Sequence, residues 1–462
     1  MKKNLKGLTL VLCTSMLLAA VPGCTKKPNT DGKIQLSVGS WPDKTGDPNG
    51  YAAREELIAE FNKKYPDIEI VPDTYAFSAD TFYAKAEGET LPILYEVPYT
   101  EAEKIIKFGY ASDLTDAFKE AGFYDNINDF VMDKISSDGK VYLIPNTVYT
   151  LGLAMNMDML KQAGYVDEDE TPKAPKTFDD LTEMAVKIKE ATGKPGFLFP
   201  TTNNAGGWYF TALAWNFGAK FMEQTDGKWE AKFDSEECVN ALQWLKDMKW
   251  KYNVMPENTL INSSDLMQTF GSGNAAMCIS SPAFVSMFKN YGMEKDNIGY
   301  ANMPAGPERN VTLMGGSYFA LSNTASKEQI DAAFKWIEFN GTTMNLTDEI
   351  KDNIKKTYKA TADDGNIVGI KDINIWSDNT PFTSYKNQII DEFANINMNH
   401  VKLYNEKGNI EFQGEEPVCA QDLYAALDAC IQEVLTNENA DCKAVLQKAN
   451  ADFQKNSLDY EN

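Results

Sequence analysis

Apolar and polar residues repeat with two different periods near the start of the chain. Apolar side chains at positions 34, 36 and 38 recur at every second residue, which predicts a strand. Residues 51–66 then place apolar side chains on one helical face and end at a proline, and residues 68–71 predict a second strand. The loop SWPDKTGDPNG separates the first strand from the helix. This strand–helix–strand order predicts a parallel sheet with helices packed on it.

The same alternation continues to the end of the chain. Strands are expected at 91–99, 195–200, 275–280, 298–304 and 317–322, and helices at 100–109, 178–193, 235–252, 327–339, 384–395, 421–435 and 441–457. Thr177 should cap the helix at 178–193, because Asp180 stands at its third position as in a capping box. Residues 141–155 form an extended segment that leaves the first domain, and 317–322 lies late in the second. We therefore expect the chain to cross between two domains more than once, as in a hinge.

The first residues carry an export signal. An apolar run from Leu8 to Val21 follows three lysines, and it is shorter than the about 20 apolar residues that span a bilayer. The following Val-Pro-Gly-Cys resembles a bacterial lipobox, in which the peptide is cut before the cysteine and lipid is added to Cys24. Two acyl chains are enough for stable anchoring, and residues 24–32 would be the tether. An ordinary signal peptide with an accidental cysteine is the alternative.

Composition limits the partners of the folded part. The chain has 462 residues, 43% of them hydrophobic, and a formal net charge of −23. So acidic a surface argues against nucleic acid and anionic lipid as partners, because both select Lys and Arg. A chain of this length with no further long apolar run is expected to form two large soluble domains, and we expect a monomer.

Cysteine and histidine usage limits the chemistry. No CxxC motif occurs, so neither a zinc site nor a thioredoxin-like motif is expected. Cys419, Cys430 and Cys442 could supply one disulfide or remain buried free thiols. His400 is the only histidine, which excludes a His-dependent triad and a multi-histidine metal site. We expect no metal and no cofactor.

Four segments together resemble the family-1 extracellular solute-binding proteins of carbohydrate uptake. They are YLIPNTVYTLGLAMNMDMLKQAGY, PKTFDDLTEMAVKIK, FGSGNAAMCISSP and MPAGPERNVTLMGGSYFALS, in the order and spacing of that family. The resemblance implies an α/β, two-lobed periplasmic-binding-protein-like fold of type II, with open sheets flanked by helices and a hinge between the lobes. Residues 1–23 would be the lipoprotein signal peptide, 24–32 the lipidated cysteine and tether, 33–148 mainly the N-terminal lobe, 149–325 mainly the C-terminal lobe, and 326–462 helical return segments shared between lobes.

The resemblance also implies a function. The expected protein is a receptor, lipid-anchored on the extracellular face of the membrane, that binds a carbohydrate (an oligosaccharide is favoured) between its lobes. It would close by a hinge motion and deliver the sugar to the permease of an ABC importer, without catalysis. Two alternatives stay open. One is a secreted glycosidase, because two carboxylates beside a sugar site could also cleave it; the other is a receptor for a peptide or another non-sugar solute.

A sugar has an apolar face and a polar rim, so aromatic rings, carboxylates and amides near the expected cleft are the candidate ligands. The tryptophans at 215, 244, 250 and 336 fall in helical patterns and are expected in the core or in surface packing. The family often has a tryptophan after the Ala-Ala-Met strand, where this chain has serines that could offer hydroxyl contacts. The predicted ligand-binding residues are Trp41, Asp43, Tyr75, Glu96, Tyr99, Asn146, Trp208, Tyr209, Ser281, Gly316, Tyr318 and Trp376.

Overall fold

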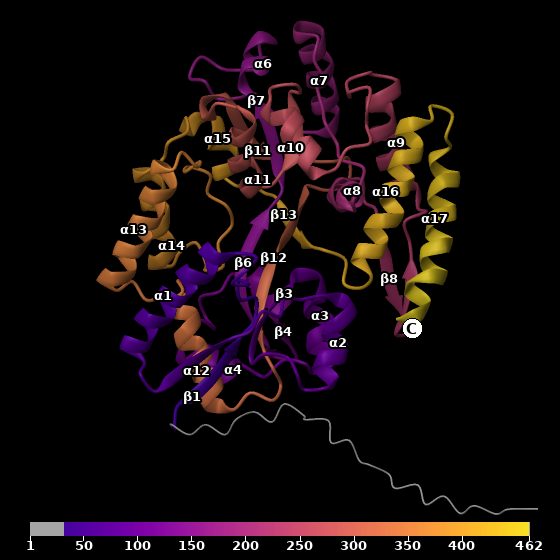
Figure 1. Ribbon diagram of the computed structural model, residues 1–462. Helices are drawn as coiled ribbons and strands as arrows, with labels where there is room; N and C mark the ends of the chain where they lie inside the picture. The colour runs from indigo at the N-terminus through magenta and orange to yellow at the C-terminus, as the bar shows by residue number, and fades with distance from the viewer. Residues whose placement is uncertain (1–31, 462) are drawn as a thin grey trace, which may run out of the picture.

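The computed structural model describes residues 32–461, which form two lobes joined by long strands (Figure 1). Cys24 and the signal peptide predicted at 1–23 lie outside these residues. No helix within 32–461 is long and apolar enough to cross a membrane.

The first lobe is built on a six-stranded sheet. Its strand order is β13-β12-β3-β1-β2, with β6 also paired to β12. The predicted parallel unit is confirmed, because β1 pairs with β2 in parallel from Ile34↔Ile68 onward. The helices and strands up to the hinge are β1 (Ile34–Val38), α1 (Pro48–Lys64), β2 (Ile68–Pro72), α2 (Ala79–Glu87), β3 (Leu94–Pro98), η1 (Tyr99–Glu101), α3 (Ala102–Lys107), α4 (Thr115–Glu120), α5 (Asp129–Ile135), β4 (Ser136–Ser137), β5 (Lys140–Val141) and β6 (Leu143–Thr150).

The second lobe is built on a three-stranded antiparallel sheet of order β10-β7-β11. Its elements up to the return crossing are β7 (Gly152–Asn156), α6 (Met157–Gln162), α7 (Phe178–Thr192), α8 (Ala205–Asn216), β8 (Met222–Thr225), β9 (Lys228–Ala231), α9 (Glu236–Trp250), α10 (Ser263–Gly271), β10 (Met277–Ser280), α11 (Pro282–Met287), η2 (Phe288–Tyr291), η3 (Lys295–Asn297) and β11 (Ile298–Asn302). The capping box predicted at the start of α7 is confirmed by reciprocal bonds between Thr177 and Asp180.

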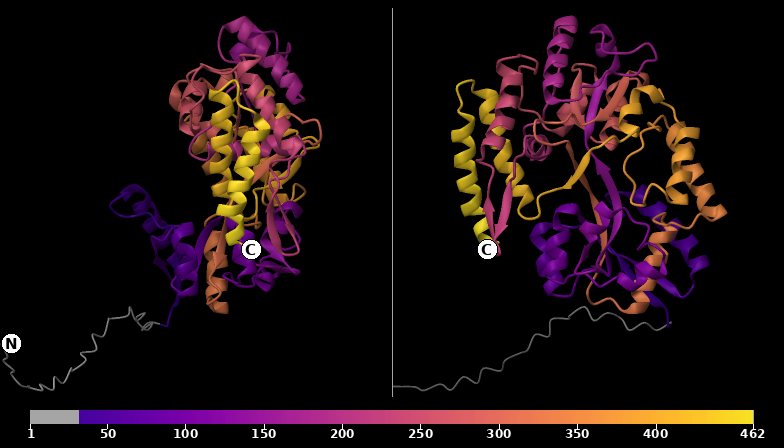
Figure 2. Two further views of the ribbon diagram at one scale, coloured as in Figure 1. Left: turned by 90° about the vertical axis from the view of Figure 1, so that its right-hand side faces the viewer. Right: turned by 180° about the vertical axis from the view of Figure 1, so that it is seen from behind.

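The remainder of the chain crosses back and covers both lobes. It comprises β12 (Val311–Leu321), α12 (Lys327–Phe339), α13 (Asp348–Asp363), α14 (Pro381–Glu392), α15 (Met398–Asn405), β13 (Glu411–Gly414), α16 (Ala420–Thr436), α17 (Cys442–Asn456) and η4 (Leu458–Tyr460). Seen from behind, β6, β12 and β13 run between the lobes (Figure 2). These crossings agree with the predicted hinge.

Each lobe has its own hydrophobic core. One apolar cluster packs the six-stranded sheet against α1, α4 and α12. A second packs the three-stranded sheet against α7, α8, α9 and α16, and a third packs it against α10 and α15. Helix α13 packs on the first core through Ile350 and Ile354, whereas α15 packs on β11. The segment after α12 therefore bridges the lobes, and the lobe boundaries given from the sequence stay predictions.

The predicted strand at 195–200 is wrong. The segment forms only an isolated bridge between Leu198 and Cys278, because Gly196 and Phe197 donate their backbone N–H groups to Val254 instead of to a neighbouring strand. Helix α13, helix α2 and the β8–β9 hairpin were not among the predicted elements. A disulfide and free thiols were the two alternatives for Cys419, Cys430 and Cys442. The structure has free thiols at all three positions.

Candidate functional site

A polar cluster lies where three strands run side by side at the hinge. Glu96 Oε1 of β3 accepts hydrogen bonds from Asn146 Nδ2 of β6 at 2.8 Å and from Ser317 Oγ of β12 at 2.6 Å. The Oγ1 atom of Thr147 lies 3.1 Å from Ser317 Oγ. The antiparallel pairing of β12 with both β3 and β6 brings these residues together. The cluster holds a partly buried carboxylate in one orientation beside the exposed Thr147 and the partly buried Ser317.

Aromatic rings continue this cluster towards the second lobe. Tyr99 and Tyr318 stack with ring centroids 4.3 Å apart and an interplanar angle of 20°. Tyr149 of β6 meets Trp208 of α8 edge to face at 6.4 Å. Gly315 makes room for Tyr149, because a Cβ there would lie 2.6 Å from the Tyr149 hydroxyl oxygen. The rings therefore connect the hinge strand to the first turn of a helix in the second lobe.

Glu415 brings a second carboxylate to these rings. It follows β13, and its Oε2 accepts a hydrogen bond from Tyr424 Oη at 2.7 Å. Burial raises the pKa of Glu415, and hydrogen bonds from Tyr424 and Trp208 oppose that rise. Burial together with Glu415 raises the pKa of Tyr149 above its ordinary value. Aromatic faces and carboxylates side by side can bind a ligand that has apolar C–H faces and hydroxyl groups.

Two cavities adjoin the hinge strands. One of about 630 Å³ includes Tyr99 and Lys107 of the first lobe, Gln224 of the second lobe and Glu415 of the return crossing. The other, about 780 Å³, lies between residues 146–148 of β6 and helices α13 and α14. Both volumes fall in the range of small-molecule pockets, roughly 300–1,000 Å³.

The structure brings half of the predicted residues into this site. Trp208 of α8 belongs to the aromatic group, and Gly316 lies in β12 between Gly315 and Ser317. Tyr209 lies against Trp208 at 4.7 Å but is fully buried behind it. The predicted residues assembled at the hinge are Glu96, Tyr99, Asn146, Trp208, Gly316 and Tyr318.

The other predicted residues lie elsewhere. Trp41 and Trp376 are each only 4% exposed and pack in the first core, Trp41 against Trp336 and Trp376 against Phe123. Trp376 nevertheless borders the larger cavity.

Three predicted polar residues support local structure outside the hinge cluster. The Oδ1 atom of Asp43 accepts the backbone N–H groups of Thr45 and Gly46. The ring of Tyr75 lies under Lys85, and burial raises the pKa of Tyr75. Ser281 is buried and caps α11. Ligand contact by these residues stays a prediction.

The sequence predictions missed Thr147, Tyr149, Ser317 and Glu415. Each lies in or next to a strand that crosses the hinge, so its neighbours come from segments far away in the chain. Alternation along β6 could have indicated Thr147 and Tyr149, since they lie inside a segment already expected to be extended. No local signal distinguishes Glu415 from the other acidic residues.

The residues from 32 to 461 contain no group of three His, Cys, Asp or Glu side chains that could hold a metal ion. The single histidine, His400, is buried in α15, and burial lowers its pKa.

Two lobes joined by crossing strands, with aromatic and carboxylate side chains at the crossing, define a two-lobed solute-binding protein. The chain belongs to the bacterial extracellular solute-binding proteins, whose family model matches residues 45–343. Members of this family are binding proteins rather than enzymes. The family prediction is confirmed.

Known relatives agree with this assignment. The chain is 24% identical to the arabinooligosaccharide-binding protein of Bacillus subtilis (strain 168), over 67% of this chain and 71% of that protein. It is 26% identical to the maltodextrin-binding protein MdxE of the same strain, over 76% and 81%. The crystal structure of UgpB from Mycobacterium tuberculosis in complex with glycerophosphocholine superimposes with a TM-score of 0.65 at 17% identity, covering 93% of this chain and 100% of that one. The predicted type II fold is confirmed by such structures.

Proposed function

We propose that this chain is the receptor of an ABC importer and binds a carbohydrate between its two lobes. The observation that carries the proposal is the contact between Tyr149 and Trp208 beside Glu415, because these three side chains come from a hinge strand, the second lobe and the return crossing. The names of the two Bacillus subtilis relatives support an oligosaccharide as the ligand. A ligand that touches groups on both sides of the hinge favours the closed state.

The proposal includes the location of the protein. Lipid attached to Cys24 would hold the receptor at the extracellular face of the membrane, close to its permease. Two acyl chains would suffice for this anchoring. The protein would act as a monomer and without catalysis.

Isothermal calorimetry of the purified protein against a panel of mono- and oligosaccharides tests the function. The expected result is saturable binding with the sugar recovered intact by chromatography. Shortened sugar products would show that the protein is a glycosidase and not a receptor. No binding across the panel would contradict carbohydrate as the ligand and favour a peptide or another solute.

Substituting Trp208→Ala should weaken binding of the sugar about 10- to 100-fold, since an aromatic ring contact and its buried area are lost. Calorimetry on the variant measures the change in Kd. Trp208→Phe should keep most of the affinity, because it keeps the ring and loses only the indole N–H that faces Glu415.

Phe108→Ala is the control for this series, because Phe108 is 53% exposed and lies on the first lobe. It should bind like the wild type. Equal affinities for Trp208→Ala and the wild type would remove Trp208 from the binding site.

A further inference from the structure

The wall of the 780 Å³ cavity differs in charge from the rest of this acidic protein. Its lining contains lysines, asparagines and threonines but no Asp or Glu, although the chain has 67 acidic residues and 44 basic ones. The polar lining residues are Asn146, Thr147, Asn340, Thr342, Asn353, Lys356, Thr357, Tyr358, Asn374 and Lys386. These side chains supply hydrogen-bond donors and two ammonium groups.

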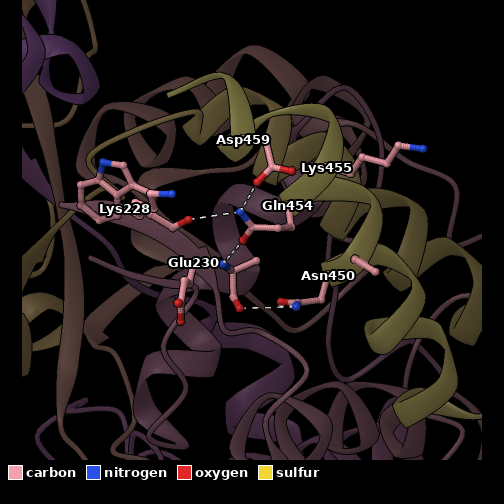
Figure 3. Close-up of a pocket in the computed structure, with 9 residues that line it drawn as sticks. Lys228, Glu230, Asn450, Gln454, Lys455 and Asp459 are labelled. Atoms are coloured by element: carbon pink, nitrogen blue, oxygen red, sulfur yellow. Dashed lines mark hydrogen bonds between the residues drawn. The ribbon is translucent and has the colours of Figure 1, made fainter. Parts of the chain in front are cut away.

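Other cavities of similar volume in the described chain are lined differently. The groove between the β8–β9 hairpin and α17 includes Glu230 and Asp459, and Gln454 joins its two walls by backbone bonds to Ala231 and Trp229 (Figure 3). The groove between α16 and α17 also includes acidic residues. The 630 Å³ cavity at the hinge contains Glu103 and Glu415. Among these four cavities, only the one at α13 and α14 has no carboxylate in its lining.

Lys386 is the more buried of the two lysines that line this cavity. Its Nζ donates a 3.0 Å hydrogen bond to Oδ1 of Asn374, which is only 5% exposed. Among residues 32–461 neither Lys386 nor Lys356 forms a salt bridge, whereas many other lysines do. A lysine ammonium has three N–H donors, and a charge removed from water is normally paired. Burial lowers the pKa of Lys386, and the charge of Asp372 opposes this.

Two carboxylates beside lining residues, Asp372 and Glu96, already accept hydrogen bonds from other groups. The Oδ1 atom of Asp372 accepts hydrogen bonds from Tyr404 Oη at 2.7 Å and from the Ile373 backbone N–H at 2.8 Å. Glu96 Oε1 is held by Asn146 and Ser317. Neither carboxylate lines the cavity. An anion entering the cavity would therefore meet donors and ammonium groups rather than other anions.

We propose that this cavity binds an anionic group of the transported solute, so that the ligand is a polyol carrying a carboxylate or a phosphate. The inference rests on the proposed function and names the chemical class of its ligand. Lys386 and Lys356 would pair with the anionic group. Asn146 and Thr147, which belong both to the cavity wall and to the hinge cluster, would bind neighbouring hydroxyl groups.

Calorimetry with matched ligands tests the inference. The probes are a galacturonic acid disaccharide, the corresponding neutral galactose disaccharide and glycerol 3-phosphate, at low and high salt. At least one anionic probe should bind about tenfold or more tightly than the neutral sugar, as expected for a charge-assisted hydrogen bond in a partly buried site, and should lose affinity with salt. Comparing the affinities for the galacturonic acid disaccharide and for glycerol 3-phosphate shows whether the anionic group is a carboxylate or a phosphate.

The outcomes separate the two proposals. Equal or tighter binding of the neutral disaccharide would overturn the anionic ligand and leave the carbohydrate receptor intact. Absence of binding by these probes and by the whole sugar panel would overturn both proposals.

Lysine variants give a second test. Lys386→Gln should lower affinity for the anionic probe about tenfold and lower affinity for the neutral sugar much less, while Lys386→Arg should retain most of the affinity. Lys356→Gln should also lower the affinity for the anionic probe. Because Lys356 is exposed on α13, this substitution should leave the packing of the core unchanged. Lys359→Gln is the matched control on the same helix, because Lys359 pairs with Asp363 outside the cavity. Wild-type affinity in both Lys386→Gln and Lys356→Gln would overturn the inference.

Discussion

Gly316→Ala is expected to destabilise the protein by about 3 kcal/mol, the sum of backbone strain and overpacking at a site that cannot expand freely. Gly316 has a φ of +153°, which L residues with a side chain rarely adopt. A Cβ added there would lie 2.1 Å from the Thr147 carbonyl oxygen, an atom of the paired strand β6. The clash would separate β12 from β6 at the hinge, next to the register shift between Ser317 and Tyr318.

Urea denaturation of the two proteins at one pH measures this effect. Gly46→Ala is the control, because the atom nearest to its added Cβ is Asp43 Oδ1 at 3.5 Å, an ordinary contact distance. The control should change the free energy of unfolding by less than about 1 kcal/mol. A Gly316→Ala variant as stable as the control would show that the strands tolerate the side chain.

Glu416→Gln is expected to stabilise the protein at pH 8 by about 3 kcal/mol and to have little effect at pH 4.5. Burial raises the pKa of Glu416 to about 7 from its ordinary 4.5, against hydrogen bonding from Trp215 and the charge of Lys134. The folded state therefore keeps this proton up to pH 7, whereas the unfolded state releases it near pH 4.5. The stabilisation is fully present below pH 4.5 and is lost as the pH rises through 7. In the wild type, Trp215 Nε1 donates a 3.1 Å hydrogen bond to Glu416 Oε1. A glutamine side chain stays neutral and can still accept this hydrogen bond.

Urea titrations at pH 4.5, 6, 7 and 8 compare the variant with the wild type, so that other titrating groups cancel. The expected result is a stability difference that grows between pH 4.5 and 7 and then levels off. Glu406→Gln, at an exposed position after α15, should show a constant difference near zero. A constant difference for Glu416→Gln would mean that Glu416 titrates normally in the folded protein.

Local patterns predicted most elements because their causes are local. The strand at β1 follows from alternation, and helix α7 from its capping box, both of which act over a few residues. The segment at 195–200 looked like a strand but pairs at only one residue, because pairing depends on a partner strand that the local pattern cannot specify. Helix α13 has no fully buried side chain, but Ile350, Ile354 and Tyr358 recur along it at helical spacing, so the local pattern could have indicated this helix as well.

The candidate site was predictable only in part. Trp208 was found because it stands in a glycine-rich helix start, and Glu96 and Asn146 because they lie in or beside expected strands. Trp41 and Trp376 were expected to contact a ligand with their rings, but they pack in the first core, Trp41 beside Trp336 and Trp376 beside Phe123. A loop position does not reveal whether a large ring turns towards solvent or inward, since distant apolar residues decide that.

The sequence by itself determined the class of this protein: two α/β lobes, several crossings between them, few options for metal or histidine chemistry, and membership in a family of solute-binding proteins. The tertiary structure alone decided which side chains meet at the hinge and that the cavity at α13 and α14 has no carboxylate in its lining. The reason is that Glu96, Asn146 and Ser317 are 50 to 221 residues apart in the chain and become neighbours only through strand pairing. Short-range patterns fix helices and strands, whereas a binding site is made by contacts between segments that are far apart in the chain.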